Sequence, residues 1–279
     1  MIQYLYLGRV DYGEALRLQE ELVALRQQDR IGNTLLLLEH PPVLTLGRNA
    51  SRANVLASDE LLTSRGVTLH EINRGGDVTY HGPGQLVGYP IFDLRSLRNP
   101  ATGARLGPVD FVRLMEEALI RVCGDYGVAA GRICKLTGVW CGLRSVDGAA
   151  LDLSCAAPQS AQGRKIGAIG IHVARGVTSH GFAFNVTTDL SDFRLINPCG
   201  ITDRPVTSLE KEMAQPAALP TLEAVAKQAA EHFGEVFDEP VAAVENPAAA
   251  PEFPAEDTPL EIPPAIERLR HRHERPVRA

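Results

Sequence analysis

The stretch around which the chain is organised reads RGGDVTYHGPGQLVGYPI and covers residues 74 to 91. It holds four glycines and one proline from Gly75 to Gly84, and a mostly apolar run from Leu86 to Leu94 follows at once. Glycines at this density let another group approach the backbone closely, and the polar side chains between them can be aimed at one point. The same composition is typical of a tight hairpin between two strands. The stretch alone leaves both interpretations open.

Length and charge exclude several classes of protein. The 279 residues are enough to bury a full core, in one domain or two, and the net charge of −6 argues against a nucleic-acid binder. No apolar run of about 18 residues is present. The first seven residues lack the basic region and the small-residue cleavage site of a signal peptide. We therefore expect a cytoplasmic protein with no membrane span.

The cysteines predict neither a disulfide framework nor a metal site. They are odd in number and irregularly spaced, and no CxxC pair occurs among Cys123, Cys134, Cys141, Cys155 and Cys199. Without such a pair the sequence supports neither a zinc ribbon nor a thioredoxin-type motif. We expect reduced thiols, with Cys123 packed in the core, and no bound metal.

Apolar patterning predicts strands mixed with helices. Strands are expected at residues 4–7, 34–39, 43–48, 67–72, 86–94, 137–141, 165–173 and 178–186. Helices are expected after three N-cap residues, Asp11, Ser58 and Asp110, and over residues 222–233. In the short helix after Ser58 both Leu61 and Leu62 should face inward. Because several strands follow one another through short turns, we predict an α/β (or α+β) fold, with a mixed sheet flanked by helices.

Two segments stand apart from this pattern. Residues 142–163 are small and polar, and we expect a surface loop there. From Asp238 onward prolines recur among alanines and glutamates, which is typical of an extended or disordered tail. The predicted organisation is one catalytic domain over residues 1–237 and a Pro/Ala-rich, largely disordered tail over residues 238–279.

Two residues outside the glycine-rich stretch are candidates for chemistry. Cys199 lies between Pro198 and Gly200, off any periodic apolar pattern, whereas core cysteines usually belong to one. A nucleophilic cysteine needs a base or a cation that favours its thiolate. Lys165 opens a strand of small and apolar residues and can point into a cavity, although an edge lysine that discourages strand pairing is the commoner case.

Histidines and arginines leave further alternatives. His81 and His180 could each act as a base or only as a structural hydrogen-bonding group, and no third ligand is spaced for a metal. Arg48 and Arg74 could bind an anion or form surface ion pairs of little consequence.

Taken together, these stretches resemble the signature of the lipoyl(octanoyl) transferases, the octanoyltransferases of lipoate biosynthesis. After residues 74–87 the similar stretches occur in the family's order, at residues 137–140, 165–170, 180–186 and 196–200. The resemblance covers roughly residues 4 to 237, and several ordered motifs are far more specific than any one of them.

The resemblance implies a fold, an activity and partners. The fold would be the catalytic-domain fold of biotin and lipoate protein ligases. The activity would be transfer of an octanoyl group from octanoyl-acyl carrier protein to a lysine on its acceptors, which are the lipoyl domains of 2-oxoacid dehydrogenase E2 subunits and the glycine cleavage H protein. We expect no cofactor, no nucleic-acid partner and no membrane partner.

The resemblance also implies roles for particular residues. Cys199 is similar to the acyl-accepting cysteine and Lys165 to the lysine that activates it. The substrate pocket would comprise Arg74, Gly75, Gly76, Asp77, Val78, Thr79, Tyr80, His81, Ala168, Ile169, Gly170, Gly181, Phe182 and Ala183. ATP would be unnecessary because the donor thioester is already activated, and the phosphate-loop pattern is absent. The alternatives are an ATP-dependent ligase of the same fold and a non-catalytic acyl-protein binder.

Overall fold

The computed structural model describes residues 1–145, 156–197, 204–215 and 219–244. Within these ranges a large mixed sheet of eight strands has the order β11-β1-β2-β6-β10-β9-β8-β7, and a small sheet has the order β4-β3-β5. The strands are β1 (Ile2–Arg9), β2 (Asn33–Glu39), β3 (Val43–Leu46), β4 (Thr68–Glu71), β5 (Val78–His81), β6 (Gln85–Ile91), β7 (Ala130–Ile133), β8 (Leu136–Arg144), β9 (Gln162–Ala174), β10 (Val177–Asn185) and β11 (Val241–Ala243).

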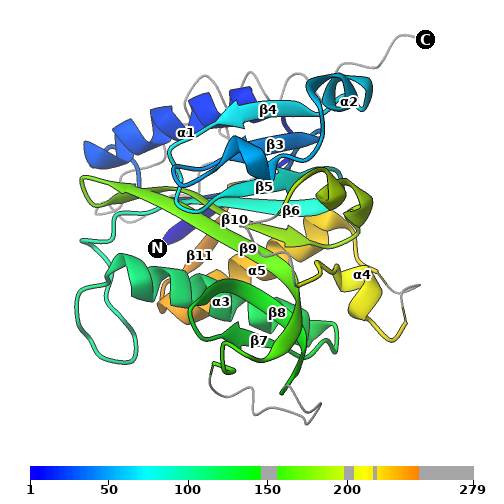
Figure 1. Cartoon of the computed structure of the whole chain (residues 1–279). Coiled ribbons are helices and arrows are strands. Elements are labelled where there is room, and N and C mark those ends of the chain that lie inside the picture. Colours follow the sequence, from blue (N-terminus) through cyan, green and yellow to red (C-terminus); the bar gives the residue numbers. More distant parts are fainter. Residues whose placement is uncertain (146–155, 198–203, 216–218, 245–279) are drawn as a thin grey trace.

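Helices cover both faces of the large sheet (Figure 1). Apolar side chains of α3 (Pro108–Asp125) and α5 (Leu222–Phe237) pack on one face, and those of α1 (Tyr12–Gln27) pack on the other. Alternate residues of β2 show this division, since Leu35 and Leu37 join the first core and Leu36 and Leu38 join the second. The predicted mixed sheet flanked by helices is therefore confirmed.

Local capping explains where two of the helices begin. Asp11 accepts hydrogen bonds from the backbone amides of Gly13 and Glu14, and Ser58 accepts one from Leu61 at the start of α2 (Asp59–Ser64), so both predicted N-caps are confirmed. The predicted cap Asp110 is wrong. Helix α3 begins earlier, with Gly107 as the N-cap and Pro108 in the first turn, where proline's missing N–H costs nothing.

The side chains of α2 correct a second prediction. Leu62 is buried, but Leu61 is 42% exposed. A helix of six residues has one narrow buried face, which cannot accommodate two successive side chains.

Strand boundaries differ from the prediction where pairing is long-range. The expected loop at residues 142–163 is shortened at both ends, because β8 continues to Arg144 and β9 begins at Gln162; residues 146–155 lie outside the described part. The sheet also extends past the boundary expected at residue 237, because β11 pairs in parallel with β1. Residues 245–279 of the predicted tail lie outside the described residues.

Three short helical elements complete the described chain. They are η1 (Arg52–Asn54), η2 (Leu190–Leu195) and α4 (Leu209–Glu212). No helix among the described residues is long and apolar enough to span a membrane.

Candidate active site

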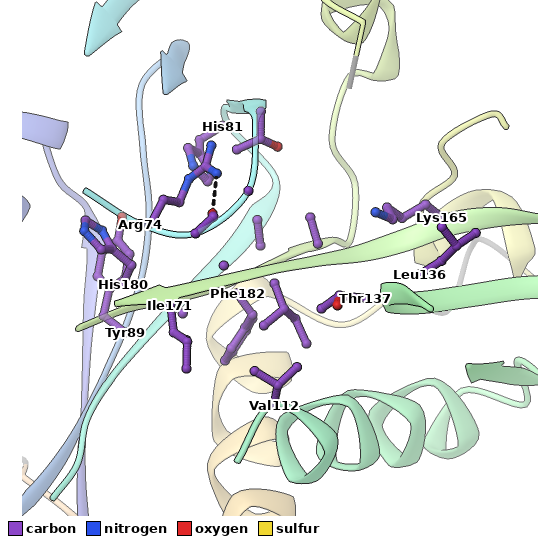
Figure 2. Close-up of a pocket in the computed structure, with 18 of the residues that line it drawn as sticks. Arg74, His81, Tyr89, Val112, Leu136, Thr137, Lys165, Ile171, His180 and Phe182 are labelled. Carbon is purple, nitrogen blue, oxygen red and sulfur yellow. Dashed lines mark hydrogen bonds between the residues drawn. The ribbon is translucent and has the colours of Figure 1, made fainter. Parts of the chain in front are cut away.

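A cavity of about 400 Å³ lies between the glycine-rich stretch and strands β9 and β10. Figure 2 shows Arg74 and His81 on the side of the stretch, Phe182 and Val112 on the opposite side, and Lys165 at one end. Strand β8 pairs with β9 only as far as the Val139–Gly167 partners. Beyond Gly167 the edge of β9 is therefore open to the cavity. Polar side chains on one wall and apolar side chains on the other suit an amphipathic ligand.

The floor of the cavity is made from small residues that pair across two strands. Gly170 is the cross-strand partner of Gly181, and Ala168 is the partner of Ala183, while the intervening partners are Ile169 and Phe182. Successive side chains point to opposite faces of a strand, so the small pairs share one face and the large pair shares the other. All six predicted residues line the cavity.

Gly170 also lets the glycine-rich stretch close over β9. The backbone amide of Gly75 donates to the carbonyl of Ile171 at 2.9 Å. A Cβ at Gly170 would lie only 2.7 Å from the Gly75 carbonyl oxygen. The close approach of the two backbones therefore requires glycine at this position.

The glycine-rich stretch has two faces, and only one of them lines the cavity. Thr79 and His81 point to the cavity, together with Gly75 and Gly76. Val78 and Tyr80 alternate with them along β5 and point into the core of the small sheet.

Asp77, Val78 and Tyr80, which the prediction placed in the substrate pocket, are not among the residues that line this cavity. Tyr80 donates its hydroxyl to Asp192 at 2.8 Å. Asp77 accepts hydrogen bonds from the side-chain amide of Asn54 and the backbone amide of Ser51. Both side chains therefore anchor the stretch by hydrogen bonds to residues that do not line the cavity.

Arg74, at the start of the stretch, is buried and hydrogen-bonded to its neighbours. Only 8% of it is exposed, and its guanidinium donates to the carbonyl and the hydroxyl of Thr45, both at 2.9 Å, and to the carbonyl of Gly75 at 3.0 Å (Figure 2). Arg74 is one of the residues that line the cavity. Arg48, the other arginine considered for anion binding, is exposed and lies outside the cavity lining.

The two histidines at the cavity are neutral near pH 7. Burial, with the nearby His40, lowers the pKa of His81 to about 3. Burial, followed by the charge of Arg74, lowers the pKa of His180 to about 4. An imidazole with such a pKa is a weak base, but its unprotonated nitrogen still accepts hydrogen bonds.

His180 adopts an uncommon backbone conformation. Its φ of 55° lies in the left-handed region, which residues with a Cβ rarely occupy. The side-chain oxygen of Gln19 accepts from its backbone amide at 2.8 Å, and its Nε2 lies 2.7 Å from Asn73 Oδ1. These two contacts stabilise the turned backbone and fix the imidazole in the wall of the cavity.

Lys165 stands at the other end of the cavity and is half-buried. Its ammonium lies 4.8 Å from the centre of the Trp140 ring, within the range of a cation–π contact. Its backbone amide donates to the carbonyl of Pro205, and its carbonyl accepts from the amide of Thr207, both at 2.9 Å. Lys165 is thus a cavity residue, in agreement with one of the two sequence alternatives.

Gly138 and Glu116 shape the strand beside Lys165. Gly138 has a φ of +123°, and a Cβ there would lie 2.5 Å from the Gly167 carbonyl and 3.2 Å from the Lys165 Cε atom. The fully buried carboxylate of Glu116 accepts from the Gly138 amide at 2.9 Å and from two arginines, Arg113 and Arg132. The bare backbone at Gly138 thus leaves room for the lysine side chain.

Cys199 lies outside the described residues, but both flanks of its segment are described. On one side the backbone amide of Asn197 donates to the carbonyl of Asn54 at 2.7 Å. On the other side Pro205 and Thr207 are hydrogen-bonded to Lys165. Residues 205–207, which follow the segment of Cys199 in the sequence, are therefore bonded to the strand of Lys165.

Several cavity residues were missed in the sequence. They are Tyr12, Tyr89, Val112, Lys135, Leu136 and Ile171. Tyr89 and Ile171 lie directly beyond recognised motifs, so an extended motif would have found them. No local signal marks Tyr12 or Val112, which face the cavity only because their helices pack there. Among the described residues, no cluster of histidine, cysteine, aspartate or glutamate could hold a metal ion.

The fold is that of the lipoate protein ligases. A bipartite lipoate protein ligase from Thermoplasma acidophilum matches with a TM-score of 0.59, covering 98% of this chain and 91% of that one, at 15% identity. A lipoate-protein ligase A bound with ATP matches with a TM-score of 0.54, covering 98% of this chain and 94% of that one, at 14% identity. At such identities the likeness shows the fold alone.

Sequence comparison defines the family within that fold. The model of the lipoyl protein ligase A/B catalytic domain matches residues 11–234. The octanoyltransferase of Acidobacterium capsulatum is 57% identical over 88% of this chain and 94% of its own length. That of Koribacter versatilis is 51% identical over 96% of this chain and 97% of its own length. The chain therefore belongs to the octanoyltransferases, a family of acyltransferase enzymes, as the sequence motifs predicted.

Proposed function

We propose that this enzyme moves an octanoyl group from octanoyl-acyl carrier protein to a lysine of a lipoyl domain, through a thioester on Cys199. The acceptors would be the lipoyl domains of 2-oxoacid dehydrogenase E2 subunits and the glycine cleavage H protein. One observation carries the proposal. Lys165 lines the same cavity as the glycine-rich stretch, and the chain after Cys199 is hydrogen-bonded to the backbone of Lys165.

In the first half-reaction the Cys199 thiolate attacks the carbonyl carbon of the donor thioester. The new bond is again a thioester, and the leaving group is the donor thiol. The ammonium of Lys165 stabilises the attacking thiolate and then gives a proton to the leaving thiolate. The apolar wall around Phe182 and Val112 takes up the aliphatic chain of the acyl group.

In the second half-reaction the ε-amine of the acceptor lysine attacks the acyl-enzyme. An amide bond forms, the Cys199 thiolate leaves, and the amine loses one proton. Lys165, left neutral by the first half-reaction, accepts that proton and is restored as the ammonium. The cycle balances without ATP because the amide is formed at the expense of a thioester.

A mass measurement tests the proposal. The protein is incubated with octanoyl-acyl carrier protein without ATP, and its intact mass is taken. We expect an octanoyl adduct on the natural chain and on the Cys134→Ala control, which removes an exposed thiol, but none on Cys199→Ala. If no adduct forms, and acceptor modification requires ATP and free octanoate, the enzyme is an ATP-dependent ligase instead. Binding of the acylated carrier protein with no transfer under either condition would indicate a non-catalytic binder.

A further inference from the structure

A buried chain of side-chain amides links His81 to the strand of Lys165. His81 Nδ1 lies 2.8 Å from Gln85 Oε1, and Gln85 Nε2 lies 2.9 Å from Asn185 Oδ1. Asn185 Nδ2 lies 2.9 Å from the carbonyl oxygen of Thr207. Gln85 and Asn185 are cross-strand partners of β6 and β10, and they are only 1% and 4% exposed.

Two backbone carbonyls fix the direction of every hydrogen bond in this chain. A carbonyl can only accept, so the amide nitrogen of Asn185 must face Thr207 and its oxygen must face Gln85. The nitrogen of Gln85 donates to that oxygen and also to the carbonyl of Tyr80, at 3.2 Å. The oxygen of Gln85 is thereby left facing His81. His81 must then carry its proton on Nδ1.

This tautomer leaves Nε2 of His81 as an unprotonated acceptor. Among the described residues, Nε2 of His81 has no hydrogen-bond partner. It is also absent from the fully buried polar atoms that lack a partner, so Nε2 is accessible to solvent. His81 lines the cavity, so that is where Nε2 is accessible. Burial lowers the pKa of the ring to about 3, which keeps this acceptor uncharged.

The far end of the chain reaches the catalytic lysine candidate. Thr207, whose carbonyl accepts from Asn185, donates its own amide to the carbonyl of Lys165 at 2.9 Å. The acceptor nitrogen and the strand that carries Lys165 are therefore held in one hydrogen-bonded frame.

We propose that Gln85 and Asn185 are positioning residues for the amine step, and that they hold His81 so that its Nε2 accepts a hydrogen bond from the attacking ε-amine of the acceptor lysine. This inference rests on the proposed function. The donor thioester carries no N–H at its reacting carbon, whereas the attacking amine carries N–H groups at the reacting atom itself. A hydrogen bond from one of these to Nε2 directs the amine lone pair at the thioester carbonyl. His81 keeps no proton from the step, because Lys165 accepts it.

The first test separates the two half-reactions in single turnovers. In Asn185→Ala and in Gln85→Leu we expect transfer from the acyl-enzyme to a lipoyl domain to slow by about ten- to hundredfold, by analogy with the loss when the hydrogen-bond partner of a metal-bound imidazole is removed. The rate of Cys199 acylation should change far less. The control is Asn33→Ala, another buried asparagine, whose oxygen accepts from Arg26 and from the Asp93 amide. It should leave the ratio of the two rates unchanged, and equal slowing of both half-reactions in the Asn185 and Gln85 variants would overturn the proposal.

The second test needs no activity, and its first measurement is made on the natural protein. Nitrogen-15 NMR of the natural protein at pH 7 should show the His81 ring protonated on Nδ1 and unprotonated on Nε2, and Asn185→Ala should populate the other tautomer. An Nε2-protonated ring or an imidazolium in the natural protein would overturn the inference. The proposed function would still stand if the Cys199 adduct formed, so the two failures are distinguishable.

Discussion

Replacing Gly170 by alanine tests whether the close approach of two backbones builds the cavity. The added Cβ would lie 2.7 Å from the Gly75 carbonyl oxygen, whereas ordinary contacts begin at 3.4 Å, so the backbones must separate by about 0.7 Å. The position of the Cβ is fixed by the backbone of residue 170, and the oxygen that it would contact is a backbone atom, so no side-chain rotation can relieve the contact. The shift would weaken the hydrogen bond from Gly75 to Ile171 and displace Thr79 and His81 from the cavity wall.

The expected cost can be stated for stability and for rate. Overpacking of this kind destabilises by about 1 to 3 kcal/mol. A misplacement approaching 1 Å in an active site costs about a hundredfold in rate. Urea unfolding gives the first quantity, and single-turnover acylation by octanoyl-acyl carrier protein gives the second.

The same substitution at Gly124 is the matched control. Gly124 lies in α3, and a Cβ there would contact nothing within 4 Å, so Gly124→Ala should be neutral or stabilising by up to about 1 kcal/mol. If Gly170→Ala acylates at the natural rate with unchanged stability, the two backbones are not held together as described, and the reasoning from the close approach is refuted.

Three further predictions concern charge. Lys165→Ala should slow Cys199 acylation by about 10² to 10⁴-fold at pH 7 and recover partly at higher pH, where the thiol ionises unaided; unchanged acylation at pH 7 would remove Lys165 from the mechanism. Glu116→Gln should destabilise the fold by about 2 kcal/mol in urea, because the carboxylate has no exposed surface and accepts charged hydrogen bonds; a smaller effect than that of an exposed glutamate would contradict this. His40, His81 and His180 have pKa values of about 4, 3 and 4 when folded, against 6.5 ordinarily, so the unfolded chain binds more protons below pH 6.5. Stability should therefore fall as the pH drops, by about 1 to 2 kcal/mol per imidazole at pH 5, and an unchanged urea midpoint between pH 7.5 and pH 5 would refute the burial argument.

Local signals in the sequence predicted the parts of the fold that local interactions decide. The caps at Asp11 and Ser58 are side-chain oxygens bound to amides two or three residues away, and such contacts follow from sequence spacing. The start of α3 was missed because proline in the first turn can replace a side-chain cap. Strand β11 could not be predicted, because its three residues pair with β1 about 240 residues earlier in the chain.

The sequence predicted those residues of the candidate site that belong to a recognised motif and lie on a strand beside the cavity. Ala168, Gly170, Gly181 and Ala183 were found because the motifs mark them, and the pairing of β9 with β10 brings them together. Which side of the glycine-rich stretch faces the cavity was not predictable. That orientation depends on the pairing of β5 with β3, an interaction between separate segments that no spacing within the stretch reveals.

The two faces of the glycine-rich stretch explain why Asp77 belongs to the recognisable signature although it does not line the cavity. Its carboxylate accepts from the side chain of Asn54, and the backbone carbonyl of Asn54 accepts from the amide of Asn197, two residues before Cys199. On the other face, His81 is linked through Gln85 and further hydrogen bonds to the strand of Lys165. On the face that points away from the cavity, the stretch is thus hydrogen-bonded to the residues before Cys199. On the face that lines the cavity, it is linked by hydrogen bonds to the strand of Lys165. A glycine-rich loop that only made room for a substrate would need neither connection.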